Sequence, residues 1–409
     1  MESKRNVAII NAVPYGSTGK IVRGISEIAS SHGWKTFTCY SWTKSMRKSC
    51  SDSIMVGSFI GKVFHILLGR LTGFNGCFSW YDTWNLIRRL KKFQPDIVNL
   101  HILHNWNINL PMLFSYIKKN NISVVWTMHD CWAFTGKCPH FVMANCDKWK
   151  TGCYGCLQYR EYPQAYVDQT KKMWALKKKW FTGVKNMTIV TPSRWLADLV
   201  AQSYLDEYPV EVINNGIDLS VFKPTESDFR KKYHCEDKTI LLGVAFGWGR
   251  RKGLDVFIEL AHRLDERYQI VLVGTDNSID KLLPESIISI HRTQNQQELA
   301  EIYTAADVFV NPTREDTYPT VNMEALACGT PVITFMTGGS PEIVSDTCGK
   351  VVNCNDLEGL LVAIMQCIEN DSTAYCVEKS GLFCQEKCYS HYIQLFDCIM
   401  RDKYKNARS

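Results

Sequence analysis

The chain has 409 residues, of which 45% are hydrophobic and 22% charged, and its formal net charge is +6. This composition excludes disordered and fibrous proteins, and the length exceeds what one hydrophobic core usually supports, which predicts two domains. The charge is unevenly distributed: residues 1–205 carry 27 Lys and Arg against 10 Asp and Glu, and residues 206–409 carry 20 against 31. The basic first half predicts an anionic partner, which nucleic acid, a phospholipid surface or a pyrophosphate-bearing acceptor would each satisfy.

The start of the chain, MESKRNVAIINAVPYG, has a short apolar run before a turn, so we expect a first β-strand there rather than a secretory signal. No segment has the ~18 consecutive apolar residues of a membrane span. We therefore expect a cytoplasmic protein, soluble or peripheral on the inner face of the cytoplasmic membrane. Its 17 cysteines should be mostly thiols in such a reducing compartment.

Short apolar runs rich in β-branched residues alternate with helical patterns, which predicts an α/β fold with parallel sheets covered by helices. The expected strands are Val7–Ala12, Asp96–Leu100, Ser123–Thr127 and Thr188–Thr191 in the first half, and Thr239–Val244, Gln269–Val273, Ile287–Ile290, Asp307–Asn311, Pro331–Thr334 and Lys350–Val352 in the second. The basic half ends at a turn near Tyr204–Pro209. We therefore expect domains over residues 1–205 and 206–388, followed by a helix over 389–409.

The first expected strand runs into Pro14-Tyr15-Gly16-Ser17-Thr18-Gly19-Lys20, ahead of a helical run. A glycine-rich turn that feeds a helix N-terminus presents free N–H groups and the positive end of the helix dipole, which suits a phosphate. A nucleotide-hydrolysing P-loop would need Gly at Pro14 and Ser or Thr at Ile21, so that alternative fails. A structural turn without a ligand remains open.

The segment from Asn311 to Gly329 carries the most specific signal, an expected strand followed by a polar loop and a helix. Ligands in open α/β sheets lie at the carboxyl ends of the strands, where Glu315, Asp316 and Glu324 can accept hydrogen bonds from sugar or ribose hydroxyls. The backbone amides of Thr320 and Val321 are candidates to hold a diphosphate.

Two more turns are expected at strand ends, Gly249-Arg250-Arg251-Lys252-Gly253 upstream and Thr337-Gly338-Gly339-Ser340-Pro341-Glu342 downstream. Clustered cations on a turn are usually solvated. Because three strand-end loops converge here on one crevice, the pattern favours anion binding.

With these motifs in place, the sequence resembles the retaining glycosyltransferases of family 4, especially members acting in bacterial exopolysaccharide (colanic-acid-type) and capsule assembly. The resemblance extends over essentially the whole chain. It rests on the order and spacing of Gly16 and Gly19, His129-Asp130, Thr191-Pro192-Ser193-Arg194-Trp195-Leu196, Asn215-Gly216-Ile217-Asp218, Lys252-Gly253, Tyr303 with Ala306-Asp307, Asp316 with Glu324, and Gly338-Gly339 with Pro341-Glu342. It implies the GT-B architecture, two facing Rossmann-like domains with a C-terminal helix that can return to the first, acceptor-side domain.

The resemblance also implies roles for individual residues. Lys252 would neutralise the departing diphosphate, Glu324 would bind the donor ribose, and Asp316 would hold sugar hydroxyls. The loop with Gly16 and Gly19 would approach the diphosphate. His129 would line the donor-sugar pocket.

Two positions depart from the family pattern. Asp316 stands where most relatives have Glu, although Glu315 lies beside it. The family arginine, usually five residues before the lysine, falls on Gly247, so Arg250 or Arg251 would have to complete the diphosphate clamp.

The family implies transfer from a nucleotide-sugar donor to a lipid-linked or soluble glycan acceptor, with retention of anomeric configuration. Fixed cations and amides aimed at the departing diphosphate should provide most of the catalysis. A donor phosphate oxygen would accept the acceptor's proton, so no metal or other cofactor is expected for the chemistry.

A cysteine-rich insert is expected over residues 131–156. Cys138, Cys146, Cys153 and Cys156 end in a Cys-x2-Cys pair, which fits a structural zinc site. The other spacings are irregular, so packed free thiols are an equal alternative.

The segment Gln169–Phe181 combines lysines with aromatic residues. It carries Lys171, Lys172, Lys177, Lys178 and Lys179 beside Trp174 and Trp180. A basic helix with aromatics is typical of an interfacial membrane contact. A surface helix with a buried aromatic stripe is the alternative, and the basic first half favours an anionic membrane surface.

Two other functions remain open at this stage. A basic, zinc-containing nucleic-acid-binding protein would explain the charge and the aromatics, but no nucleic-acid motif is present and the loop with Asp316 and Glu324 would have no role, so we expect no nucleic-acid partner. Another enzyme with the same two-domain fold, such as a sugar epimerase, is the second alternative.

Overall fold

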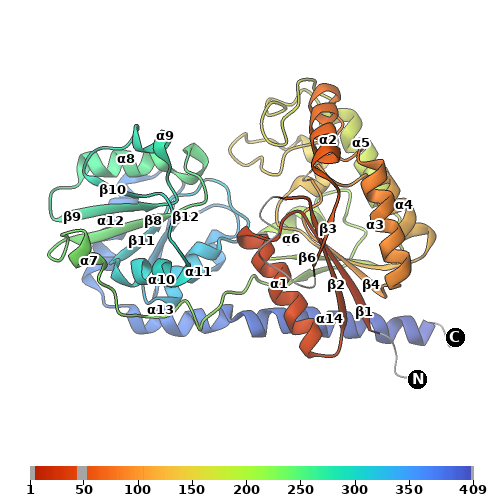
Figure 1. The fold of residues 1–409 in the computed structure, drawn as a ribbon. Helices are drawn as coiled ribbons and strands as arrows, with labels where there is room; N and C mark the ends of the chain where they lie inside the picture. Colours follow the sequence, from red (N-terminus) through yellow and green to blue (C-terminus); the bar gives the residue numbers. More distant parts are fainter. Residues whose placement is uncertain (1–4, 44–52, 105, 407–409) are drawn as a thin grey trace. The chain divides into compact units, whose positions relative to one another are not determined.

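The computed structural model describes residues 5–43, 53–104 and 106–406. The chain divides into two compact domains, one formed by Met1–Asn214 together with Tyr389–Ser409 and one formed by Asn215–Cys388. Each has a wholly parallel sheet covered by helices, which confirms the predicted α/β class with two Rossmann-like domains (Figure 1).

The first domain has a seven-stranded sheet with the order β3-β2-β1-β4-β5-β6-β7. Its elements are β1 (Asn6–Asn11), α1 (Gly16–Ser31), β2 (Lys35–Ser41), β3 (Ser53–Val56), α2 (Phe59–Thr72), α3 (Trp80–Phe93), β4 (Ile97–Leu100), α4 (Leu110–Lys119), β5 (Ser123–Thr127), α5 (Thr170–Phe181), β6 (Met187–Thr191), α6 (Arg194–Ala201) and β7 (Val210–Val212). The strand order reverses between β1 and β4, whose register pairs Val7 with Ile97.

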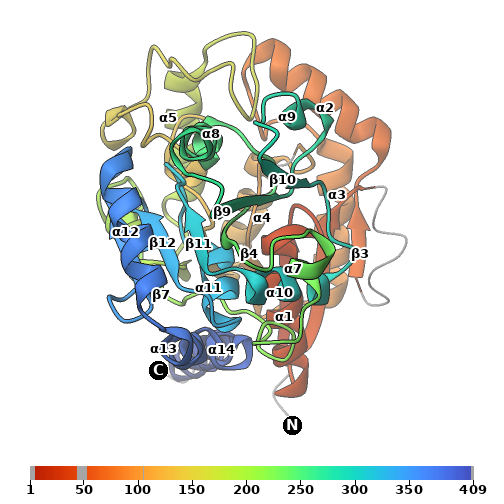
Figure 2. The ribbon, with the colours of Figure 1, turned by 90° about the vertical axis from the view of Figure 1, so that its left-hand side faces the viewer.

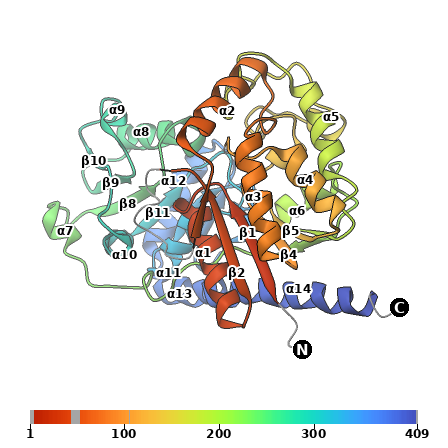
Figure 3. The same ribbon diagram turned by 45° about the vertical axis from the view of Figure 1, so that its right-hand side comes forward.

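One face of this sheet packs against α3 and α4, where Leu86, Leu90 and Phe114 are buried (Figure 3). The rings of Phe114 and Phe181 lie 4.7 Å apart, and the ring of Trp126 on β5 lies 4.8 Å from Phe181. These aromatic contacts tie α4 and α5 to the middle of the sheet.

The C-terminal helix α14 (Gln385–Asn406) packs on the first domain from Tyr389 onward. The Phe396 ring lies 5.4 Å from Trp34, and the Thr127 hydroxyl is 3.2 Å from the Tyr392 hydroxyl. The Tyr389 ring lies where a Cβ on Gly24 of α1 would stand, so α1 has room for it only because residue 24 is glycine. The expected return of this helix to the first domain is therefore confirmed.

The second domain has a six-stranded sheet with the order β10-β9-β8-β11-β12-β13. Its elements are α7 (Phe229–Lys232), β8 (Thr239–Val244), α8 (Leu254–Arg263), β9 (Tyr268–Val273), α9 (Asn277–Asp280), β10 (Ile287–Ile290), α10 (Gln296–Ala305), β11 (Val308–Asn311), α11 (Thr320–Ala327), β12 (Val332–Phe335), β13 (Gly349–Val352), α12 (Leu357–Glu369) and α13 (Thr373–Ser380). Here the order reverses between β8 and β11.

Both faces of the second sheet are buried. Along β8, Ile240 and Leu242 face the core under α10, α11 and α13, whereas Leu241 faces the core under α8 and α12 (Figure 2). Burial on both faces explains why these strands appear in the sequence as continuous apolar runs.

The expected domain boundary after residue 205 lies too early. The strand β7 pairs with β6, with Ile189 opposite Val210, so residues 206–214 belong to the first domain. This strand was missed because it is an edge strand of three residues, only partly buried, with Glu211 in its middle. The strands β2 and β3 were also missed, since Lys35–Ser41 mixes threonines with apolar residues instead of forming an apolar run.

None of the helices in the described part of the chain combines the length and the apolarity that a bilayer crossing requires.

Candidate active site

The second domain brings two predicted catalytic residues together at the point where its strand order reverses. Lys252 follows β8 and Asp316 follows β11, and these two strands are neighbours in the sheet. The Lys252 Nζ lies 2.6 Å from the Asp316 Oδ2, and each side chain is 18% exposed. The carboxyl edge at such a reversal is where open parallel sheets bind their ligands. The pair therefore lies where the fold places a ligand, partly screened from water.

The turn after β8 is built on glycines. Gly253 has φ +76°, and a Cβ there would come within 2.5 Å of the Pro312 carbonyl oxygen, so only glycine allows this turn to touch the loop after β11. The turn itself, Arg250–Lys252, is a single 3₁₀ turn. The close approach of the two loops is what places Lys252 against Asp316.

The two candidate arginines have different surroundings. The Arg251 Nη1 donates to the Glu315 carbonyl at 3.2 Å, and the Arg251 carbonyl accepts from the Arg314 N–H at 2.8 Å. Arg250 is exposed on the same turn. Arg251 is thus engaged in joining the two loops, whereas the Arg250 side chain is exposed.

Sequence reasoning missed the structural role of Arg314. Its Nη1 and Nη2 each lie 2.8 Å from the Asp255 carboxylate, and its Nε lies 2.7 Å from the Asn355 Oδ1. Burial opposes ionisation of Asp255, but the Arg314 guanidinium holds its pKa below the usual range. Arg314 fastens the loop after β11 to the start of α8, and no local pattern distinguished it from its neighbours.

Glu324, the predicted ribose ligand, is on α11 and is 7% exposed. The Tyr303 hydroxyl donates to its Oε2 at 3.1 Å. Burial, with the nearby Glu324 carboxylate, raises the Tyr303 pKa well above its usual value, so this phenol stays protonated as a donor. Tyr303 was part of the family motif without an assigned role, so the motif was the signal that could have identified it.

The other residues expected around this loop fall into two groups. Thr320 and Val321 form the partly exposed first turn of α11, which carries no acidic residue. Glu315 is buried, and its carbonyl accepts from Arg251 and from the Thr313 hydroxyl. Thr320 and Val321 thus begin α11, whereas Glu315 contributes its backbone carbonyl to the contact with the turn after β8.

The loop after β12 supports Asp316 from the other side. Gly338 has φ +55°, and a Cβ there would overlap the Asp316 carbonyl oxygen. The Gly339 N–H lies 3.3 Å from the same carbonyl. Glycine at position 338 is therefore needed for this close backbone approach.

In the first domain, Gly16 and Gly19 open helix α1 directly after β1. Gly16 has φ +70° and is exposed, and a Cβ on Gly19 would collide with the Pro14 backbone. The first turn of α1 carries no acidic residue. The turn thus presents helix N–H groups at the reversal between β1 and β4, an arrangement that suits an anion.

His129 follows β5 and contacts His101, which follows β4. The His101 Nδ1 lies 2.9 Å from the His129 Nε2, and the His101 Nε2 lies 3.0 Å from the Asn99 Oδ1. The Asn99 amide nitrogen donates to the Val125 carbonyl at 2.9 Å, so its oxygen must be the acceptor toward His101. His101 therefore carries its proton on Nε2.

This hydrogen-bond chain determines the tautomer of His129. Burial and the neighbouring His129 lower the His101 pKa well below 6.5, so its Nδ1 is an acceptor. Burial lowers the His129 pKa to about 4, against the opposing charge of Asp130. His129 is consequently neutral near pH 7 with its proton on Nε2 and the lone pair on Nδ1. Sequence reasoning found His129 but missed Asn99 and His101.

Asp130, the next residue, belongs to a second chain of hydrogen bonds. Its Oδ2 lies 2.9 Å from the His104 Nε2, and the His104 Nδ1 lies 3.0 Å from the Tyr162 hydroxyl. Burial opposes its ionisation, but the charge and hydrogen bond of His104 lower the Asp130 pKa to about 2. Asp130 is therefore a fixed anion that orders the turn after β5.

The predicted zinc ligands lie together in the insert after β5. Burial is the main cause that raises the pKa of Cys138, to about 12, and the nearby Cys156 and Cys153 raise it further. Cys146 likewise adds to the raised pKa of both Cys153 and Cys156. In the described ranges, no three His, Cys, Asp or Glu side chains lie in an arrangement that could hold a metal ion. The zinc site, with Cys146 as its fourth ligand, stays a prediction.

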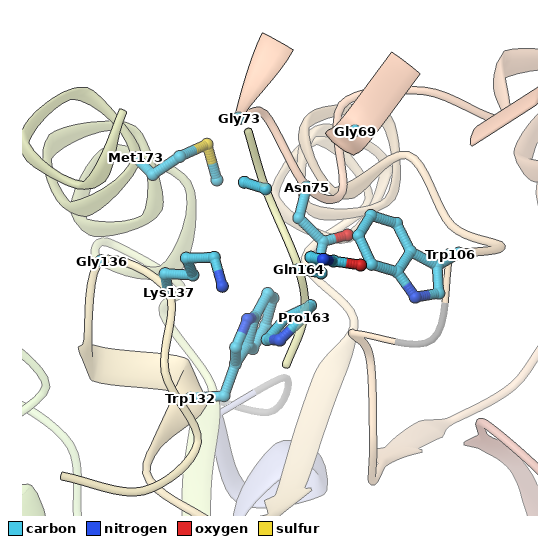
Figure 4. Close-up of a pocket in the computed structure, with 11 residues that line it drawn as sticks. Gly69, Gly73, Asn75, Trp106, Trp132, Gly136, Lys137, Pro163, Gln164 and Met173 are labelled. Atoms are coloured by element: carbon cyan, nitrogen blue, oxygen red, sulfur yellow. The ribbon is translucent and has the colours of Figure 1, made fainter. Parts of the chain in front are cut away.

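A pocket beside this insert is lined by Trp106, Trp132 and Lys137, among others (Figure 4). Its volume of about 10 Å³ is that of a single water molecule. It is too small to be a sugar site.

Two of the residues on which the expected membrane contact of α5 rested, Lys177 and Trp174, make contacts inside the protein. Lys177 is fully buried and donates to the carbonyls of Trp132 and Thr135, with its ammonium 3.6 Å from the Trp132 ring centre. The Trp174 indole N–H donates inward to the Trp149 carbonyl at 2.9 Å. The lysines that remain exposed are Lys171, Lys172, Lys178 and Lys179.

Comparison with known sequences matches both domains to glycosyltransferase families. Residues 61–221 match the model of Glycosyltransferase Family 4, and residues 237–370 match that of Glycosyl transferases group 1. The colanic acid biosynthesis glycosyl transferase WcaC of Escherichia coli is 24% identical over 271 residues, 63% of this chain and 64% of that protein. The match thus spans slightly less than two thirds of the relative's length.

Comparison with solved structures shows the same fold. Sucrose-phosphate synthase from Thermosynechococcus elongatus superposes with a TM-score of 0.72 at 16% identity, over 97% of this chain and all of that one. Anabaena HepE, solved in complex with UDP, gives a TM-score of 0.67 at 12% identity, over 96% and 100% of the two chains. The two domains thus each match a glycosyltransferase family model, and the whole chain has the GT-B fold.

Proposed function

We propose that this protein transfers a glycosyl group from a nucleotide-diphosphate sugar to a lipid-linked glycan acceptor, with retention, in the synthesis of a bacterial surface polysaccharide. The observation that carries the proposal is the Lys252–Asp316 pair, held at 2.6 Å where the strand order of the second sheet reverses. A cation and a carboxylate side by side suit a ligand that has an anionic diphosphate joined to a hydroxyl-rich sugar.

Each part of the donor has a matching group in the second domain. The Glu324 carboxylate, oriented by Tyr303, accepts hydrogen bonds from ribose hydroxyls. The N–H groups at Thr320 and Val321 face a phosphate at the start of α11. Lys252 then exchanges its contact with Asp316 for the leaving diphosphate, while Asp316 accepts hydrogen bonds from the sugar. Cations and amides fixed in advance lower the barrier because they need no reorganisation as charge develops.

Retention fits the chemistry of these groups. Asp316 holds the sugar hydroxyls in this proposal, so it is not the group that takes the acceptor's proton. A phosphate oxygen of the donor can instead accept the acceptor's proton on the face from which the diphosphate departs. In this proposal, Lys252 and Arg250 supply the positive charge at the leaving group.

Two observations support the proposed acceptor and cellular location. The relative from Escherichia coli is named for colanic acid biosynthesis, a surface polysaccharide process, which supports a glycan acceptor. The basic first half, with 27 Lys and Arg against 10 Asp and Glu over residues 1–205, supports an anionic acceptor such as a lipid pyrophosphate at the cytoplasmic membrane face.

The proposal is tested by incubating the purified protein with UDP-, GDP- and dTDP-sugars and a set of lipid-pyrophosphate glycans. We expect nucleotide diphosphate release that depends on both substrates, a product heavier by one sugar, and an unchanged anomeric configuration by NMR. The double variant Lys252→Ala/Asp316→Asn is the negative control. Release no greater than that of this control with every donor would overturn the proposal, and an inverted product would overturn retention alone.

A further inference from the structure

Helix α2 of the first domain turns its large apolar side chains toward solvent. The exposed residues are Phe59, Ile60, Val63, Phe64, Leu67 and Leu71, with Ile60 at 79%. In an ordinary surface helix such residues would face the core. Exposed apolar residues are normal singly, but a contiguous face of this kind marks an interaction surface.

The inner face of α2 explains why the apolar side chains point outward. It consists of Gly61, His65 and Gly69, which are spaced four residues apart. Gly61 packs against Asp82, and Gly69 packs against the Trp106 ring so closely that a Cβ would not fit. Small and polar residues thus make the contact with the protein, and the large apolar ones are left for a partner.

His65 fixes this orientation of the helix. Its Nε2 accepts from the Gly76 N–H at 3.1 Å, and its Nδ1 donates to the Ser79 hydroxyl at 2.7 Å. Both ring nitrogens are therefore bonded to the segment that joins α2 to α3. Rotating the apolar face inward would break both bonds.

Helix α3, which follows α2 in the chain, also exposes aromatic side chains. Trp80, Tyr81 and Trp84 are exposed, Tyr81 at 73%, and Arg88 lies 5.8 Å from the Trp84 ring centre. We call these three residues and the six of α2 the α2–α3 face. Across α2 and α3, both fully described, the one acidic residue is Asp82, which is buried, whereas Arg88, Arg89, Lys91 and Lys92 are exposed.

Cations of α5 flank the end of α2. Gly73, which caps α2, packs against the Val167 carbonyl and the Gln169 side chain, directly before α5 begins. Lys171 and Lys172 are exposed on the first turns of α5. An apolar and aromatic surface thus lies beside lysines and arginines, with no exposed acid on α2 or α3.

We propose that the α2–α3 face docks the protein on an anionic phospholipid bilayer, with the apolar side chains in the acyl boundary and the flanking cations at the headgroups. Tryptophan and tyrosine favour this interfacial depth, and basic residues near an anionic surface add to the attraction. This inference deepens the proposed function, because a lipid-linked acceptor would be presented at the same surface.

The charge pattern favours lipid over a second copy of the chain. A self-associating face needs complementary groups on the same patch, but the α2–α3 face is bordered by cations and would repel its own copy. An anionic bilayer offers both the apolar interior and the opposite charge.

The test is co-sedimentation of the full chain with phosphatidylcholine vesicles that do or do not contain phosphatidylglycerol, without donor or acceptor. We expect binding to the anionic vesicles that weakens as salt rises, because surface attraction is screened. The variant Ile60→Ser/Phe64→Ser/Leu67→Ser should bind at least about tenfold less. The variant Arg88→Gln/Lys171→Gln/Lys172→Gln should lose most of the preference for anionic vesicles.

A matched control removes three exposed apolar residues of the second domain, Leu282→Ser/Val362→Ser/Leu382→Ser, and should bind as the wild type does. Urea unfolding of each variant verifies that it is folded. Wild-type binding by the folded α2 variant would overturn the proposal. The proposal would also be overturned if the wild type were a dimer and the α2 variant a monomer with unchanged vesicle binding. The face would then be a contact between two copies of the chain. Because no substrate is present, failure of vesicle binding is distinguishable from failure of sugar transfer.

Discussion

The Nδ1 of His101 lies 2.9 Å from the Nε2 of His129, joining the carboxyl ends of two neighbouring strands, β4 and β5. Asn99 accepts from the other nitrogen of His101, so the pair has one arrangement of protons near neutral pH. His129 is thereby kept neutral, with its proton on Nε2 and the acceptor nitrogen at Nδ1. His101 acts here as a positioning residue.

Replacing His101 by Phe should keep an aromatic ring in this position and remove the nitrogen that accepts from His129. In wild-type protein, ¹⁵N NMR should show a protonated Nε2 and an unprotonated Nδ1 on His129. The His101→Phe variant should show a mixture of both tautomers and turn over roughly tenfold more slowly, as expected for the loss of about one hydrogen bond. His262→Phe, at an exposed position, is the control. An unchanged His129 spectrum would show that His101 does not set the tautomer.

Removing the Lys252 ammonium should affect the chemical step most. Lys252→Ala is expected to lower kcat by about 10²–10³, the loss typical of one preorganised charge-stabilising group. Arg267→Ala, which removes an exposed cation paired with Asp265, should leave kcat unchanged. Steady-state nucleotide release measures both variants. Wild-type turnover by Lys252→Ala would exclude it as the group that stabilises the leaving diphosphate.

Replacing each of the two arginines beside Lys252 should produce a different defect, in donor binding for one and in stability for the other. Arg250→Ala should weaken donor binding by about tenfold with little change in stability, because the proposed function places its exposed guanidinium against the donor diphosphate. Arg251→Ala should instead lower the urea midpoint, because it removes the bond to the Glu315 carbonyl. Donor affinity is measured by titration and stability by urea unfolding for both variants. Weaker donor binding in Arg251→Ala and a lower urea midpoint in Arg250→Ala would assign the diphosphate contact to Arg251.

Glu324 and Tyr303 should contribute unequally to donor binding. Glu324→Gln is expected to cost about 1.5–3 kcal/mol of donor binding free energy, as for a hydrogen bond to a charged acceptor. Tyr303→Phe should cost about 1 kcal/mol, because it removes one neutral donor to that carboxylate. Calorimetric titration with the donor measures each. Equal affinity for Glu324→Gln and wild type would remove Glu324 from the site.

Acid should destabilise the protein partly through His65. Burial lowers its pKa to about 3, and its Nε2 accepts from the Gly76 N–H, so protonation would break that bond. The unfolded chain binds this proton near pH 6.5, so stability is full above that pH and falls by about 1.4 kcal/mol per pH unit between about 6.5 and 3. Relative to His65→Gln, the wild type should lose about 2 kcal/mol between pH 7 and pH 5 in urea unfolding. If the free energies of unfolding of the two proteins differed by the same amount at pH 7 and pH 5, the lowered pKa of His65 would be contradicted.

Local sequence was sufficient for most of the strands and for the residues that end them. Both sheets are parallel and buried on both faces, so strands such as β8 and β11 appear as apolar runs that end abruptly at polar loops. Lys252 and Asp316 could therefore be placed at strand ends before any contact was known. The edge strand β7 was not predicted, because a short and partly exposed strand has no such apolar run.

The tertiary structure alone decided which of these ends meet. Lys252 and Asp316 are 64 residues apart, and they touch because β8 and β11 are neighbours in a sheet whose order is not the order of the chain. The same applies to Arg314 with Asp255 and to His101 with His129, since a hydrogen-bond partner across the sheet leaves no local signal. Orientation was decided in the same way: Lys177 turns inward to two carbonyls, and α2 turns its apolar side outward. Periodicity identifies the faces of a helix, but the small residues and hydrogen bonds at the contact determine which face the protein buries.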